Sequence, residues 1–98
     1  MEQSHPILAE LITKDFQLEG NPFDDFGDLE DIQNRLIPII AHLLDRDFSR
    51  LLQAMYRIDI NENHLKVALS SDAPAEKISL LIIERELQKI KTRMKYRT

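Results

Sequence analysis

Three side chains that could offer oxygen ligands stand at alternate positions in the stretch DINENHLKVALS, namely Asp59, Asn61 and Asn63. An EF-hand calcium loop begins in this way, but it also needs glycine at its sixth position and a bidentate glutamate at its twelfth. His64 and Ser70 occupy those two positions. We therefore interpret the stretch as a corner between two helices, in which Asp59 ends one helix and Asn61 is the N-cap of the next.

The residues needed for other site chemistry are also scarce. The absence of cysteine excludes disulfides, Cys-ligated zinc, iron–sulfur clusters and thiol catalysis. The three histidines, His5, His42 and His64, form no Glu-x-x-His or His-x-x-x-His pair, so helical metal-ligand pairs are missing. No nucleophile elbow and no glycine-rich phosphate loop occur. We predict that the chain is not an enzyme, with no catalytic or metal-binding residues and no cofactor.

Charge is distributed unevenly along the chain. Residues 1–31 contain nine acids and one base, a sum of −8, whereas residues 84–98 contain two acids and six bases, a sum of +4. The middle of the chain is neutral, which leaves the formal net charge of −4. This pattern predicts an acidic head and a basic tail that could attract each other, within one chain or between two.

The basic tail is one candidate interaction surface. Its members are Arg85, Lys89, Lys91, Arg93, Lys95, Tyr96 and Arg97. They could contact phosphates, which makes a small nucleic-acid-binding or regulatory protein the alternative function. The isoelectric point near 5.3 argues against it, because nucleic-acid readers are usually basic. A solvated helix end favoured by the helix dipole is the simpler interpretation.

Two aromatic residues form a second candidate surface. Phe23 and Phe26 stand in the acidic, turn-rich stretch NPFDDFGD. They could anchor a partner, or they could pack on the domain's own core and hold the linker down.

The composition and the apolar spacing predict helices. No glycine occurs from Asp28 to the last residue, and apolar residues recur at steps of three and four. Asp28 is a good N-cap for a first long helix, and Pro38 should kink or split that helix. Whether the helices over 28–44 and 46–58 are continuous stays open. The last helix is expected from about 74 to 94, with an apolar face wide enough for burial in a bundle.

These elements predict an all-α fold, an antiparallel bundle of four to five helices with an acidic N-terminal arm. We expect residues 1–27 to form the arm, with a short helix over 4–15 and a linker, and residues 28–98 to form the bundle domain.

The stretches RDFSRLLQAMYRIDINENHLKVAL and LIIERELQKIKTR, which span residues 45–93 or so, resemble small uncharacterised all-helical proteins of bacteria. The resemblance implies a helical fold and a bacterial, cytoplasmic setting, and it implies no activity.

The overall prediction is a non-catalytic protein–protein interaction or oligomerisation module. No signal-peptide pattern opens the chain, and its longest nearly apolar run, LIPIIAHLL, is far shorter than the roughly 20 residues that span a bilayer. We therefore predict a cytoplasmic protein without membrane contact. A homodimer is the first partner hypothesis and an unknown protein partner the second.

Overall fold

The computed structural model describes residues 4–20 and 22–97, and at Ser4, Tyr96 and Arg97 only the backbone. The described residues form five α-helices and no strand, which confirms the all-α prediction. The helices are α1 (Ser4–Asp15), α2 (Leu29–Arg46), α3 (Phe48–Ile58), α4 (Glu62–Leu69) and α5 (Pro74–Arg97).

The predicted caps at Asp28 and Asn61 are confirmed. The Asp28 side chain accepts a hydrogen bond of 2.9 Å from the backbone N–H of Asp31. The side-chain oxygen of Asn61 accepts from the N–H groups of Asn63 and His64, at 2.9 and 3.1 Å. Both residues thus satisfy donors in the first turn, which has no partners within the helix.

Asp47 alone separates α2 from α3 and settles the open question of their continuity. Its backbone N–H donates to the carbonyl of Leu43, which closes α2. Its side chain accepts from the N–H of Arg50 at 3.2 Å, which starts α3. One residue is thus C-cap and N-cap at once, so the chain turns without glycine or proline.

Pro38 does not split α2, which is continuous from Leu29 to Arg46. Of the two effects expected at this residue, a kink or a split, the split does not occur. Proline removes the hydrogen bond to the carbonyl four residues earlier, here that of Asn34. Pro38 and Asn34 are both exposed, so water can reach the carbonyl and the helix continues.

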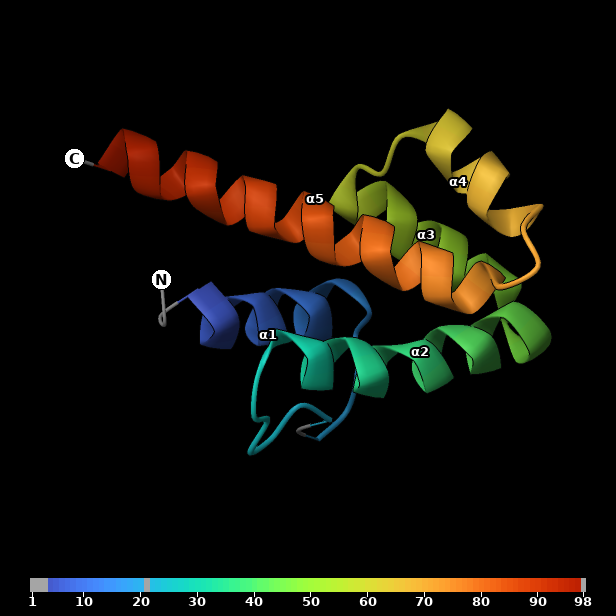
Figure 1. Cartoon of the computed structure of the whole chain (residues 1–98), viewed down its shortest axis with the longest axis horizontal. Helices are drawn as coiled ribbons and strands as arrows, with labels where there is room; N and C mark the ends of the chain where they lie inside the picture. The colour runs from blue at the N-terminus through green and yellow to red at the C-terminus, as the bar shows by residue number, and fades with distance from the viewer. Residues whose placement is uncertain (1–3, 21, 98) are drawn as a thin grey trace.

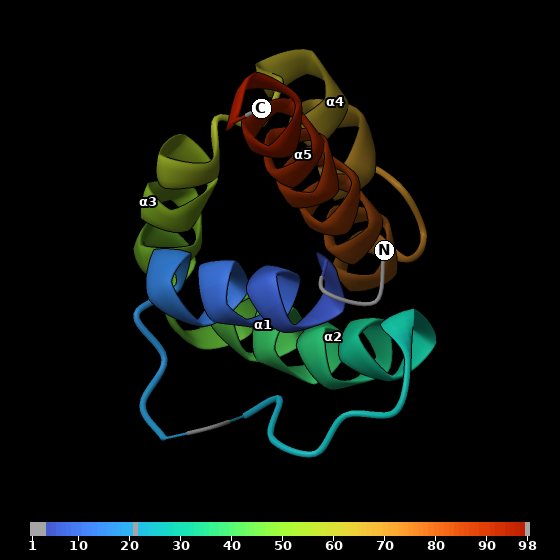
Figure 2. The ribbon, with the colours of Figure 1, turned by 90° about the vertical axis from the view of Figure 1, so that its left-hand side faces the viewer.

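Helix α5 lies at the centre of the molecule and contacts all four other helices. In Figure 1 it runs in the direction opposite to α1 and α2, and Figure 2 shows α3 and α4 beside it. Ile78 and Ile82 on α5 are fully buried. Among the described residues, no helix combines the length and the apolar character needed to cross a bilayer.

The N-terminal region belongs to the same core as the bundle. Leu8 and Ile12 on α1, and Phe16 directly after it, are 0% exposed and join the hydrophobic core cluster that includes residues of α5. The boundary between residues 27 and 28 is therefore the end of a loop, and the same core continues on both sides of it.

Contacts to its backbone hold the acidic loop between α1 and α2. The Arg35 guanidinium donates to the carbonyl oxygens of Asp24 and Asp25, at 2.5 and 3.3 Å. The N–H of Gly27 donates to the Asp31 carboxylate at 2.9 Å, and this bond and the Arg35 guanidinium lower the pKa of Asp31. Arg35 therefore orders this part of the acidic arm in two ways. It donates to backbone carbonyls of the loop, and it pairs with the Asp31 carboxylate.

Candidate functional site

The C-terminal end of α5 projects beyond the bundle. Five consecutive residues, 91–95, are exposed, and five positions of an α-helix cover its whole circumference. Figure 1 shows this end extending past the other helices. Lys91, Arg93 and Lys95 therefore have the exposure predicted for the basic tail, whereas the side chains of Tyr96 and Arg97 lie outside the described residues.

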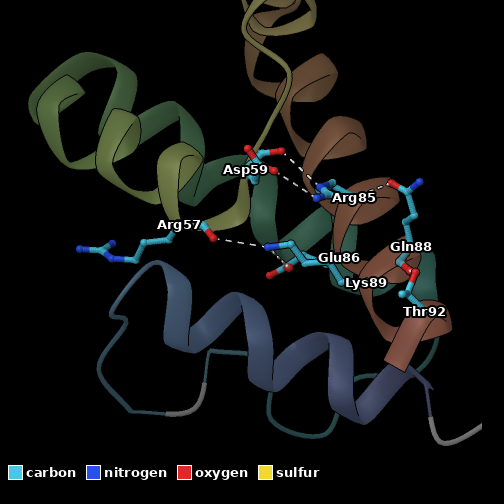
Figure 3. A network of polar contacts seen from close by, with 7 residues as sticks. All are labelled: Arg57, Asp59, Arg85, Glu86, Gln88, Lys89 and Thr92. Carbon is cyan, nitrogen blue, oxygen red and sulfur yellow. Dashed lines mark hydrogen bonds and ion pairs between the residues drawn. The ribbon is translucent and has the colours of Figure 1, made fainter. Parts of the chain in front are cut away.

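The other two tail bases, Arg85 and Lys89, fasten the C-terminal end of α3 (Figure 3). Arg85 donates to the carbonyl oxygen of Asp59 at 3.2 Å and pairs with its carboxylate at 3.3 Å. Lys89 donates to the carbonyl of Arg57 at 3.4 Å. Cations at a helix C-terminus satisfy its free carbonyls and complement the helix dipole. These two bases thus have structural contacts within the chain.

Glu86 lies directly beneath these contacts and is 0% exposed. Within the described part of the chain, neither of its carboxyl oxygens accepts a hydrogen bond, and the Lys89 ammonium lies 3.7 Å from one of them (Figure 3). Burial raises the pKa of Glu86 to about 8, the Asp15 carboxyl adds to the rise, and Lys89 acts in the opposite sense. Glu86 is the most strongly perturbed acid described, and its enclosure leaves no room for a substrate.

The two aromatic candidates in the acidic loop differ in exposure. Phe23 is 4% exposed and belongs to the hydrophobic core, so it presents almost no surface to a partner. Phe26 is half-buried and packs against the same core. Of the two roles considered for these aromatics, Phe23 has the second, since it packs on the domain's own core and holds the linker down.

A surface that the sequence interpretation missed lies on α3. The helix buries Leu51, Met55 and Ile58 against the core. Its other apolar residues follow a second line at steps of four, in which Phe48 is 42% and Tyr56 84% exposed and Leu52 is half-buried between them.

This second line borders an apolar hollow of about 360 Å³ between α3 and the start of α4, here called the α3–α4 groove. Among the described residues, its lining consists of Leu52, Met55, Tyr56, Asp59, Ile60, Asn61, Glu62 and Leu65. Five of these residues are apolar or aromatic, two are acidic and none is basic. The groove is therefore an apolar hollow with an acidic rim.

A larger hollow of about 560 Å³ shares the linker residues 59–61 with the groove. Its lining is polar and includes Arg85, which is bonded to Asp59 and to the side chain of Gln88 at 3.0 Å. Asp59, Arg85 and Gln88 are thus already paired with each other. Among the described residues, no three acidic or histidine side chains gather as metal ligands would.

The density of apolar residues on α3 is the signal that could have revealed the groove. A helix that packs on one side needs one apolar stripe, but α3 has apolar residues at positions 48, 51, 52, 54, 55, 56 and 58. One buried face requires fewer apolar residues than these. Some of the apolar side chains of α3 therefore need a second surface to cover them.

No protein-family model, curated protein or solved structure matches the chain. The resemblance to small bacterial helical proteins therefore stays a prediction.

Proposed function

We propose that the protein is a non-catalytic protein–protein interaction module that binds its partner through the α3–α4 groove. The observation that supports this proposal is the uncovered apolar line on α3, which ends at Tyr56 with 84% of the residue exposed. Exposed apolar surface next to a hollow costs solvation free energy until a partner covers it. Aromatic residues such as tyrosine are also enriched in the centres of interfaces.

Photo-crosslinking tests the proposal. A crosslinking phenylalanine analogue replaces Tyr56 in the full chain, which is expressed in the cells that naturally make it. We expect one or a few specific protein adducts, identified by mass spectrometry. The matched control places the same analogue at Val67, which is 71% exposed on α4 and does not line the groove. Equal adduct patterns at both positions would contradict the proposal.

A nucleic-acid partner is the second candidate, and the exposed basic side chains Lys91 and Arg93 near the end of α5 are the observation that favours it. Phosphate contacts would be sensitive to salt and would not depend on Tyr56. Repeating the capture after nuclease treatment separates the two candidates. Adducts that disappear with nuclease, and that are equal for the Tyr56 and Val67 positions, would support the second candidate over the first.

A further inference from the structure

We propose that the occupant of the α3–α4 groove is the exposed basic end of α5 from a second copy of this chain. This inference rests on the proposed function, because it names the partner of the same groove.

The end of α5 has the chemistry of a small amphipathic ligand. Lys91, Met94 and Lys95 are three and four residues apart, so they share one face of the helix. Met94 is 39% exposed and supplies an apolar surface beside the two bases. Methionine is unbranched and adapts its shape to irregular apolar hollows.

The α3–α4 groove has the complementary arrangement. Its apolar lining, with Leu52 and Tyr56 on one side and Leu65 on the other, matches an apolar surface. Asp59 and Glu62 form its acidic rim, and the Asp59 side chain is 82% exposed although it pairs with Arg85. A rim of one charge sign facing a helix end of the other sign favours the correct pairing and its rate of formation.

The groove and the α5 end of one chain cannot meet. Helix α5 is one continuous element from Pro74 to Arg97, so its end cannot fold back onto the side of the bundle where α3 and α4 lie. Figure 1 shows that end pointing away from α4. The contact must therefore join two copies. If each copy fills the other's groove, the pair closes as a symmetric dimer, and otherwise the copies form chains.

The contact is small, since it involves about two turns of helix, so we expect weak association. Sedimentation of the full chain from about ten micromolar to about one millimolar should show reversible self-association. Raising the salt from about 50 to about 500 mM should weaken it, because exposed charges are screened over shorter distances.

Charge reversal and apolar truncation locate the contact. Lys91→Glu and Tyr56→Ser should each raise the dissociation constant about tenfold or more. Both residues are exposed, and circular dichroism checks that each variant is folded. The matched controls, Lys77→Glu and Val67→Ser, change an exposed base on α5 and an exposed apolar residue on α4 that lie outside the contact and should leave association unchanged.

A charge swap makes the test specific for this pairing. Glu62→Lys and Lys91→Glu should each weaken association, and the double variant should associate more strongly than either single variant. The inference would be overturned if the double variant associated more weakly than both single variants. It would also be overturned if Lys91→Glu left the association unchanged.

A chain that remains monomeric at the highest concentration also overturns the inference. If the Tyr56 crosslinker still captures another protein in that case, the proposed function survives with a different partner. If it captures nothing beyond the Val67 control, the proposed function fails as well.

Discussion

At the scale of single residues, Glu86 makes the free energy of unfolding depend on pH. Its pKa lies at about 8 in the folded chain and at 4.5, the ordinary value, when unfolded. Between these values the folded chain holds a proton that the unfolded chain releases. The stabilisation from the neutral carboxyl is thus complete below the unfolded pKa and is lost as the pH rises through the folded pKa.

Glu86→Gln should remove this loss, because glutamine has nearly the same shape and no charge to bury. We expect similar stability for variant and parent at acidic pH, and a variant more stable by a few kcal/mol at about pH 9. Urea unfolding across the pH range measures the difference. Glu84 is exposed, so Glu84→Gln serves as the control. Its free energy of unfolding should change with pH in the same way as that of the parent. A parent whose stability does not fall as pH rises towards 9 would contradict the assignment.

Residue types alone predicted the caps but not the burial of Glu86. Asp28 and Asn61 act on the backbone two or three positions away, so local sequence determines their role. The enclosure of Glu86 comes from the packing of several helices, with Asp15 of α1 among its surroundings. In the sequence it stands among the charges of RELQK and is indistinguishable from a solvated glutamate.

At the scale of elements, arginines from α3 hold the C-terminal end of α1. Arg50 donates to the carbonyls of Phe16 and Gln17, at 3.1 and 2.8 Å. Arg57 donates to the carbonyl of Asp15 at 2.7 Å. The docking of α1 therefore uses polar contacts at its end as well as the apolar core.

Arg50→Met should weaken this docking, because methionine retains much of the apolar stem and removes the donors. We expect a loss of about 1–3 kcal/mol in the free energy of unfolding, measured in urea. Arg46→Met is the matched control, since Arg46 pairs with the exposed Asp45 at 3.1 Å and such surface pairs contribute little. Equal effects of the two substitutions would argue against a capping role for Arg50.

Periodicity predicted the helices, but several properties of the elements depend on their neighbours. Asp47 is of a residue type that often caps helices, but no glycine or proline stands beside it, so the local sequence left the continuity of α2 and α3 open. Whether Arg85 and Lys89 are free or bonded depends on where α3 ends in space. The α3–α4 groove is likewise a gap between packed helices, which no single stretch of sequence encodes.

At the scale of the whole molecule, the exposed end of α5 should be separable from the fold. Deleting residues 93–98 should change the free energy of unfolding by no more than about 1 kcal/mol, because 93–95 are exposed. Thermal and urea unfolding measure this change. Deleting residues 89–98 should cost several kcal/mol, because it also removes Lys89 and the buried Ile90. Similar losses for both deletions would show that the end belongs to the packed structure.

The charge pattern takes on a specific meaning at this scale. Figures 1 and 2 share their vertical axis, and in both the acidic loop lies at the bottom and the end of α5 near the top. The sequence predicted opposite charges at its two ends, but only the arrangement of helices shows that they lie on opposite sides of the molecule. A contact between these two regions would therefore need two copies.

The central position of α5 has a consequence for the order in which the chain folds during its synthesis. The ribosome releases α1, α2, α3 and α4 before the helix that contacts all of them has been made. Their buried faces have no central partner during that interval, and such unpaired apolar surface attracts chaperones. We expect the native core to assemble only after α5 has left the exit tunnel, so the synthesis of this helix sets the time of folding.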